Sequence, residues 1–216
     1  MSNYLLLDFL HILLFVYWLG PDWGVFVNGR RVADPTLSNG ERMRFLKASV
    51  AIDFFPRSCV VLIVAVGLTL ASVGHHIPLG PVGLTLTWAV AVIWLLLVWF
   101  TGYVLQPGPL KARLDGIHVN LRHVVTVALA GVGIYSLVSG APIASQWLAV
   151  KFLLVAVLIA IGSVLRVIVK TWVADLTGVP GSEGAIARTY PHTRKLVYFF
   201  WLLSISIAFL GVTKPF

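Results

Sequence analysis

The first apolar stretch of the chain carries a line of polar and aromatic side chains at helical spacing. Its members, at intervals of four and three residues, are Tyr4, Asp8, His11, Phe15, Trp18 and Asp22. In an α-helix they share one face, and a polar face inside a membrane must look toward the interior of a bundle. At that depth the neutral imidazole of His11 is a good ligand for a porphyrin iron. The alternative is a packed histidine that bonds Asp8.

A lysine in a later apolar stretch is the second candidate group. Lys151 follows Trp147 by one helical turn and falls in the same half of the membrane as His11. Either Lys151 extends to the nearby interface, or it pairs with Asp8 or with a ligand carboxylate near His11. We therefore predict Lys151 and Asp8 as catalytic candidates and Trp147 as a cofactor contact.

Two charged residues lie one turn apart in the second apolar stretch. Asp53 and Arg57 have the i,i+4 spacing of a helical ion pair. Mutual neutralisation is one interpretation. Contact between Arg57 and a haem propionate or a quinone is the other, so Arg57 is a predicted cofactor-binding residue.

Three polar residues, His118, Arg122 and His123, lie around the start of the fourth apolar stretch. His118 and Arg122 share a helix face, whereas His123 lies about 140° from His118 at about 100° per residue. The two histidines therefore cannot easily hold one metal. Arg122 is a predicted cofactor-binding residue. The candidates for a second ligand to the metal held by His11 are His123 and a residue near the outer loop. An interfacial position is the alternative for both histidines of this stretch.

Six apolar stretches must position these groups. Each approaches the roughly 20 residues that a spanning helix needs, and they cover residues 4–27, 49–73, 82–105, 120–139, 146–169 and 195–213. Hydrophobic residues make up 59% of the chain and charged residues only 11%, against about 25% charged in a soluble domain. We predict an all-α integral membrane protein, a six-transmembrane-helix bundle forming one domain over residues 1–216. Gly20-Pro21 predicts a kink or an early end in the first helix.

The basic residues predict the orientation of the bundle. Thirteen of the 16 Lys and Arg residues fall on alternate loops or their flanks: Arg30, Arg31, Arg42, Arg44, Lys47, Lys111, Arg113, Arg122, Arg166, Lys170, Arg188, Arg194 and Lys195. Only Lys214 falls on the opposite side. The positive-inside rule then places these loops in the cytoplasm and both termini outside a bacterial-type cytoplasmic (inner) membrane. This placement explains the net charge of +8 without a nucleic-acid partner.

Cysteine and methionine are scarce. The single cysteine, Cys59, excludes an internal disulfide or a CxxC motif. The two Met and one Cys are a poor supply for soft copper ligation. The sequence also contains no nucleotide-binding or hydrolase motif in the structural context that such a motif requires.

Four segments together resemble one known family. They are LLLDFLHILLFVYWLG, ERMRFLKASVAIDFFPRSCVVLIVAVGLTL, QWLAVKFLLVAVL and VYFFWLLSISIAFLGVTKPF. They resemble the four helices of the HemJ-type protoporphyrinogen oxidases, and CopD-like membrane domains share the pattern. The resemblance implies a helical membrane protein that binds haem b, with His11 as the important histidine and Lys151 as the important lysine. The chain differs in having two additional helices, the third and the fourth.

Three functions follow as hypotheses. The first is a haem b-binding membrane redox protein, an oxidoreductase or cytochrome b-like subunit that transfers electrons with quinone or oxidises a porphyrinogen. The second is a CopD-like protein that transports or handles copper. The third is a membrane anchor subunit that binds partner subunits or a second copy of itself.

Overall fold

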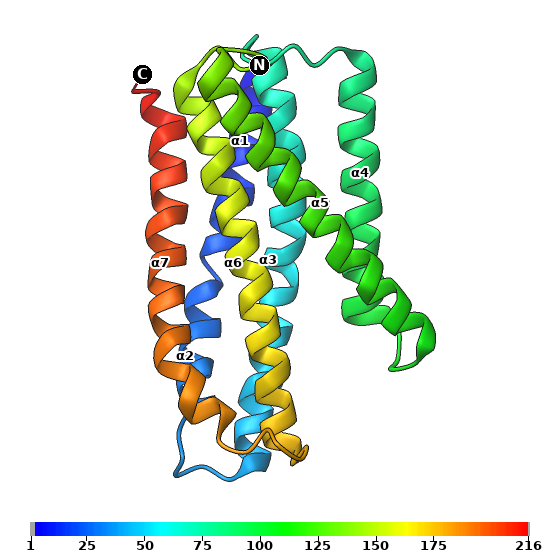
Figure 1. Cartoon of the computed structure of the whole chain (residues 1–216), viewed down its shortest axis with the longest axis vertical. Helices are drawn as coiled ribbons and strands as arrows, with labels where there is room; N and C mark the ends of the chain where they lie inside the picture. The colour runs from blue at the N-terminus through cyan, green and yellow to red at the C-terminus, as the bar shows by residue number, and fades with distance from the viewer. Residues whose placement is uncertain (1–2, 216) are drawn as a thin grey trace.

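The computed structural model describes residues 3–215, and this range contains helices and connections but no strands. The helices are α1 (Asn3–Leu19), α2 (Asp22–Val32), α3 (Asn39–Val73), α4 (Pro81–Trp99), the π-helical η1 (Phe100–Val104), α5 (Pro109–Ser139), α6 (Gln146–Thr177) and α7 (Ala185–Thr213). Most run along one long axis, while α5 crosses the others diagonally (Figure 1).

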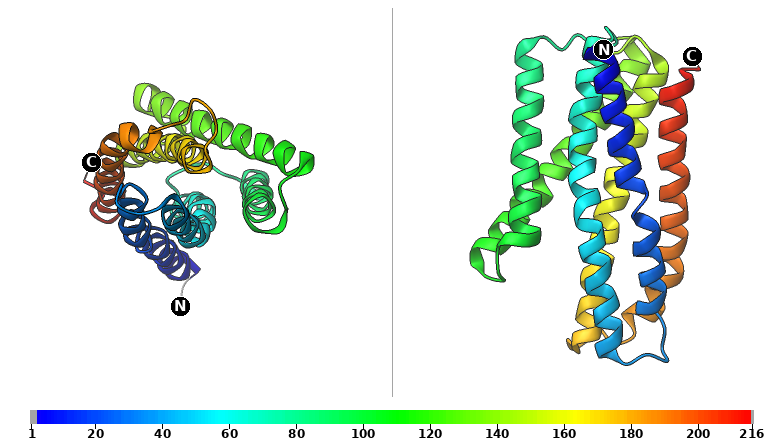
Figure 2. Two further views of the ribbon diagram at one scale, coloured as in Figure 1. Left: turned by 90° about the horizontal axis from the view of Figure 1, so that it is seen from below. Right: turned by 180° about the vertical axis from the view of Figure 1, so that it is seen from behind.

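Six spans in the described chain are long and apolar enough to cross a membrane, with α1 and α2 together forming the first. The predicted all-α six-helix bundle of a multi-pass membrane protein is therefore confirmed. The start of α1 and the end of α7 lie at the same end of the bundle (Figures 1 and 2), as an even number of spans requires. We call this the upper end; the lower end carries the connections 33–38, 105–108 and 178–184.

The first span is broken where the sequence predicts it. α1 ends at Leu19 and α2 begins at Asp22. Pro21 has no backbone N–H to donate and its ring disfavours a continuous helix. The N–H of Gly20 closes the last turn on the carbonyl of Val16 at 2.9 Å. The break leaves Asp22 at the start of a separate helix.

Several helices are longer than their apolar stretches predicted. α3 begins at Asn39 rather than at residue 49, and α5 begins at Pro109 rather than at residue 120. At the start of α3, the side chain of Ser38 accepts from the backbone N–H of Glu41 at 3.3 Å, and the Glu41 carboxylate accepts from the backbone N–H of Ser38 at 2.9 Å. This capping box satisfies free helix donors in a polar sequence, so the helix continues where the hydropathy falls.

Four spans form a central bundle. The first span packs on α3, α3 contacts α6, and α6 packs on α7. α4 lies beside α3, and α5 lies across α6 (Figures 1 and 2). A Cβ built at Gly133 of α5 would lie 2.9 Å from the carbonyl oxygen of Ala149 on α6, so the missing side chain lets these two backbones approach closely.

Candidate functional site

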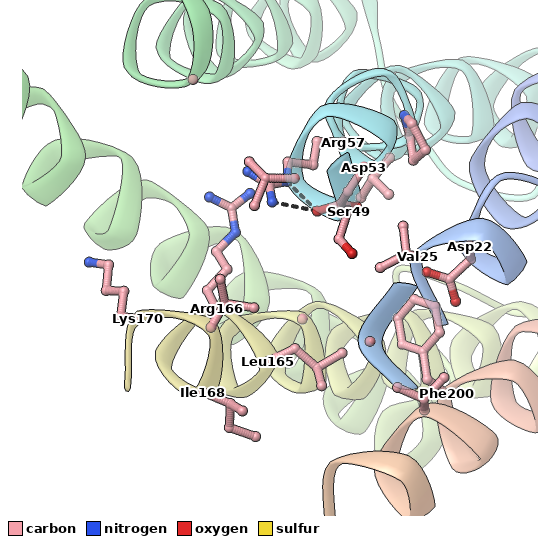
Figure 3. Close-up of a pocket in the computed structure, with 18 of the residues that line it drawn as sticks. Asp22, Val25, Ser49, Asp53, Arg57, Leu165, Arg166, Ile168, Lys170 and Phe200 are labelled. Carbon is pink, nitrogen blue, oxygen red and sulfur yellow. Dashed lines mark hydrogen bonds and ion pairs between the residues drawn. The ribbon is translucent and has the colours of Figure 1, made fainter. Parts of the chain in front are cut away.

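The lower half of the bundle encloses a cavity of about 390 Å³, which we call the lower pocket. Small-molecule and cofactor pockets measure about 300–1,000 Å³. Its apolar wall includes the aromatic side chains of Trp18, Phe26, Trp94, Trp172 and Phe200. Its ionisable lining includes Asp22, Asp53, Arg57, Asp115, His118, Arg122 and Arg166. Figure 3 shows the α2, α3 and α6 sides of this pocket.

Arg57 is bound by a carboxylate of its own helix. Its Nε donates to Oδ2 of Asp53 at 2.6 Å, and its guanidinium also forms an ion pair with the same oxygen (Figure 3). The helical pair predicted from the i,i+4 spacing is thus present. Because Asp53 neutralises Arg57, this residue contributes little net charge to the pocket.

Arg122 reaches from α5 to α6. It is only 5% exposed, and its Nη2 donates to the hydroxyl of Ser163 and to the carbonyl of Ile159. Both acceptors are neutral, and within residues 3–215 Arg122 forms no ion pair with a carboxylate. A guanidinium has five N–H donors, so Arg122 retains donors for a ligand in the pocket.

Arg166 is a pocket residue that the sequence analysis assigned to a loop flank. Its side chain extends from α6 across the pocket toward Arg57 and Asp53 (Figure 3), and it interacts electrostatically with Arg57, Arg122 and Asp115. The signal that could have revealed it is its position four residues after Gly162, on the helix face that also carries Lys151.

The depth of these arginines can be estimated from the helix rise. At about 1.5 Å per residue, Arg166 lies about 30 Å below the start of α6, and the hydrocarbon core of a bilayer is about 30 Å thick. If the upper end of α6 lies at one boundary of the hydrocarbon core, Arg166 lies near the opposite boundary. The charged part of the lower pocket then adjoins the headgroup region, while its aromatic wall lies within the hydrocarbon depth.

The pocket contains one buried imidazole. His118 is 3% exposed, and its Nε2 lies 3.2 Å from the indole Nε1 of Trp94, which donates the hydrogen. An accepting Nε2 places the ring proton on Nδ1. His118 and Arg122, one turn apart on α5, therefore face the pocket together, as their shared helix face predicts.

His123 does not join either histidine. Its side chain is exposed on α5 and does not line the lower pocket. The structure does not bring His123 to His11, and a metal shared by the two stays a prediction. The physical reason is the helical rotation that separates His123 from the buried face carrying His118 and Arg122.

A second group of polar residues, the upper cluster, gathers Asp8, His11 and Lys151. His11 and Lys151 interact electrostatically, as do Lys151 and Asp8. Nδ1 of His11 is buried without a hydrogen-bond partner. The predicted proximity of these three residues is found, but none of them lines the lower pocket.

Trp147 belongs to the same upper region. It is 8% exposed, its ring meets the His76 ring edge-on at 5.3 Å, and Nζ of Lys214 lies 5.8 Å from its centre. The predicted site residues thus divide between the two ends of the bundle: Asp8, His11, Trp147 and Lys151 lie above, and Arg57 and Arg122 lie below.

Comparison of the chain with models of protein families, with curated proteins and with solved structures finds no match. Within residues 3–215, His, Cys, Asp and Glu side chains form no group of three or more that could hold a metal ion.

Proposed function

We propose that this chain is a membrane redox protein that binds haem b in the lower pocket and exchanges electrons with quinone. One observation carries the proposal: His118 and Arg122 lie one turn apart on α5, are both buried, and both line the same cavity. An imidazole is a common axial ligand of haem iron, and a guanidinium is suited to a propionate. Haem would supply one-electron redox chemistry when bound.

The residues of the lower pocket fit this group. The single lone pair of Nε2 of His118 accepts the hydrogen bond from Trp94, so a neutral His118 would coordinate iron through it once the Trp94 indole gave up this hydrogen bond. The aromatic wall suits a flat apolar ring, and the arginines lie at the depth expected for its acid groups. Oxidation of a porphyrinogen would use the same acid-group contacts.

The upper cluster offers a competing position for the axial ligand. The unpartnered Nδ1 of His11 favours it, and Asp8 and Lys151 would then be the neighbouring charged groups. His11 packs directly against α3 at Gly67, however, and does not line the cavity. We therefore place the porphyrin in the lower pocket.

The absorption spectrum of the purified protein tests both placements. We expect a reduced-minus-oxidised spectrum of the b type in the wild-type protein, its loss or displacement in His118→Ala, and its retention in His11→Ala. His123→Ala is the matched control, because it removes an exposed imidazole from the same helix. Loss in His11→Ala alone would move the site to the upper cluster, and a protein that stays colourless after haem is supplied would refute haem binding.

We further propose that the lower end faces the cytoplasm of a bacterial-type inner membrane, with both termini outside. The support is the positive-inside rule together with the helix directions: the strongly basic connections and helix ends around residues 30–47 and 188–195 lie at the lower end.

A further inference from the structure

We infer that the lower pocket selects a ligand with two negative charges and that Arg166 binds one of its acid groups directly. The inference rests on the proposed ligand of this pocket being anionic, but it does not require that ligand to be a porphyrin. The evidence is the balance of charged groups around the cavity.

Four guanidinium groups line the cavity, those of Arg57, Arg122, Arg166 and Arg194, and among the described residues only Arg57 has a carboxylate at ion-pair distance. Asp53 pairs with Arg57. Arg122 donates to neutral oxygens alone. Within residues 3–215, Arg166 has neither a hydrogen-bond acceptor nor an ion-pair partner, although Asp115 and Asp53 contribute to its electrostatic environment. The guanidinium groups of Arg122 on α5 and Arg166 on α6 therefore face the cavity without a paired carboxylate.

Two other carboxylates line the cavity, those of Asp22 and Asp115, and within residues 3–215 neither forms an ion pair with Arg122 or Arg166. The side chain of Asp22 lies on the α2 side of the cavity (Figure 3) and accepts a hydrogen bond from the indole Nε1 of Trp201 on α7. An anion that entered between these two arginines would meet no carboxylate bound to either.

Simple extension to the membrane surface does not explain Arg166. A long basic side chain near a helix end commonly turns toward the interface. Arg166 instead points across the cavity to the α3 side, where Arg57 lies (Figure 3). Like charges repel strongly where the dielectric constant is low. Asp53 offsets the charge of Arg57, so the charges that an entering anion would offset are those of Arg166 and Arg122, which interact electrostatically.

The geometry defines the chemistry of the ligand. The fork of a guanidinium matches the oxygens of a carboxylate or a phosphate. Two such groups suit either a dicarboxylate or a single doubly ionised phosphate. The aromatic side chains of Trp18, Trp94 and Phe200 line the same cavity and suit an apolar body attached to those acid groups.

Binding of defined anions to the purified full-length chain tests the inference. The probes are protoporphyrin IX, its dimethyl ester, which has no ionised carboxyl group, and dodecyl phosphate. We expect the Kd for the dianionic probe to be about tenfold higher in Arg166→Gln than in the wild-type protein, equivalent to about 1.4 kcal/mol. The Kd for the dimethyl ester should be the same in both proteins. Arg31→Gln is the control, because it removes one cation whose side chain is 60% exposed on the lower end of α2.

A variant with the opposite expected effect keeps the test independent of the folding of Arg166→Gln. Asp53→Asn removes the carboxylate that neutralises Arg57, so we expect tighter binding of the dianionic probe, with a several-fold lower Kd. The dimethyl ester should again bind as it does to the wild-type protein.

The outcomes separate this inference from the proposed function. Arg166-dependent binding of dodecyl phosphate without binding of protoporphyrin IX would support the dianion site and refute the porphyrin as its ligand. The inference is overturned if Arg166→Gln and Arg31→Gln have the same effect on every probe, or if the ester loses affinity as much as the diacid. It is equally overturned if Asp53→Asn weakens binding of the dianion.

Discussion

The imidazole of His11 on α1 occupies the space that a side chain at Gly67 on α3 would need. A Cβ built at position 67 would lie 2.8 Å from Cε1 of His11, closer than carbon atoms normally approach. We expect Gly67→Ala to lower the free energy of unfolding by about 1–3 kcal/mol, as overpacking does, and a thermal melt in detergent measures it. Gly116→Ala is the control, because nothing lies within 4 Å of a Cβ there; equal melting temperatures would show that α1 and α3 are not closely packed here.

The contact between α5 and α6 at Gly133 provides a second stability test. A Cβ at this position would meet the backbone oxygen of Ala149 at 2.9 Å, and a backbone atom cannot turn aside as a side chain can. We expect Gly133→Ala to lower the free energy of unfolding by about 1–3 kcal/mol. Gly131→Ala, two residues away with open space around its Cβ, should leave stability unchanged or slightly raised, because alanine favours helix over glycine.

The hydrogen bond from Trp201 to Asp22 joins α7 to the helix that follows the break. Trp201→Phe keeps an aromatic ring but leaves the carboxylate of Asp22 without this donor. Asp22 is partly buried. We expect a loss of about 1–3 kcal/mol in the free energy of unfolding, because its carboxylate loses a hydrogen-bond donor. Trp23→Phe, at a side chain that is 62% exposed, should have little effect. In a protein that already carries Asp22→Leu, Trp201→Phe should lower the free energy of unfolding no more than Trp23→Phe does. If Trp201→Phe costs as much there as in the wild-type protein, its effect comes from packing and not from the hydrogen bond.

The proposed orientation can be tested with single cysteines. Ala144 lies exposed in an upper connection and Glu183 lies exposed in a lower one. In intact cells, a thiol reagent that cannot cross membranes should label Ala144→Cys, and it should label Glu183→Cys only after the cells are opened. The natural Cys59 is 2% exposed and should give a low background in the wild-type chain. The reverse labelling pattern would place both termini in the cytoplasm.

The number of spans and the break in the first were predictable from sequence because both depend on local properties. Apolar length specifies a spanning helix, and Pro21 interrupts the backbone whatever surrounds it. The extensions of α3 and α5 were not predicted, since hydropathy reports burial in lipid and not helix formation. The Ser38 and Glu41 pair was visible in the sequence as a start signal, but it lies outside the apolar stretch.

The candidate site was predictable only where one helix determines it. The shared face of His118 and Arg122 and the ion pair of Asp53 with Arg57 follow from helical spacing. The role of Arg166 depends on how α6 rotates against α3 and α5. The sequence places Arg166 on the helix face of Gly162 and Lys151, but that face alone does not specify which helices it meets. The same tertiary packing separates His11 from the arginines that were expected to serve its cofactor.

The lower pocket draws its lining from every described helix, including Phe200 in the last one. During synthesis on the ribosome, the cavity therefore stays open on one side until the final span has entered the membrane. A ligand of this pocket would be enclosed only after α7 has packed against the earlier spans, and its capture would report that α7 is in place.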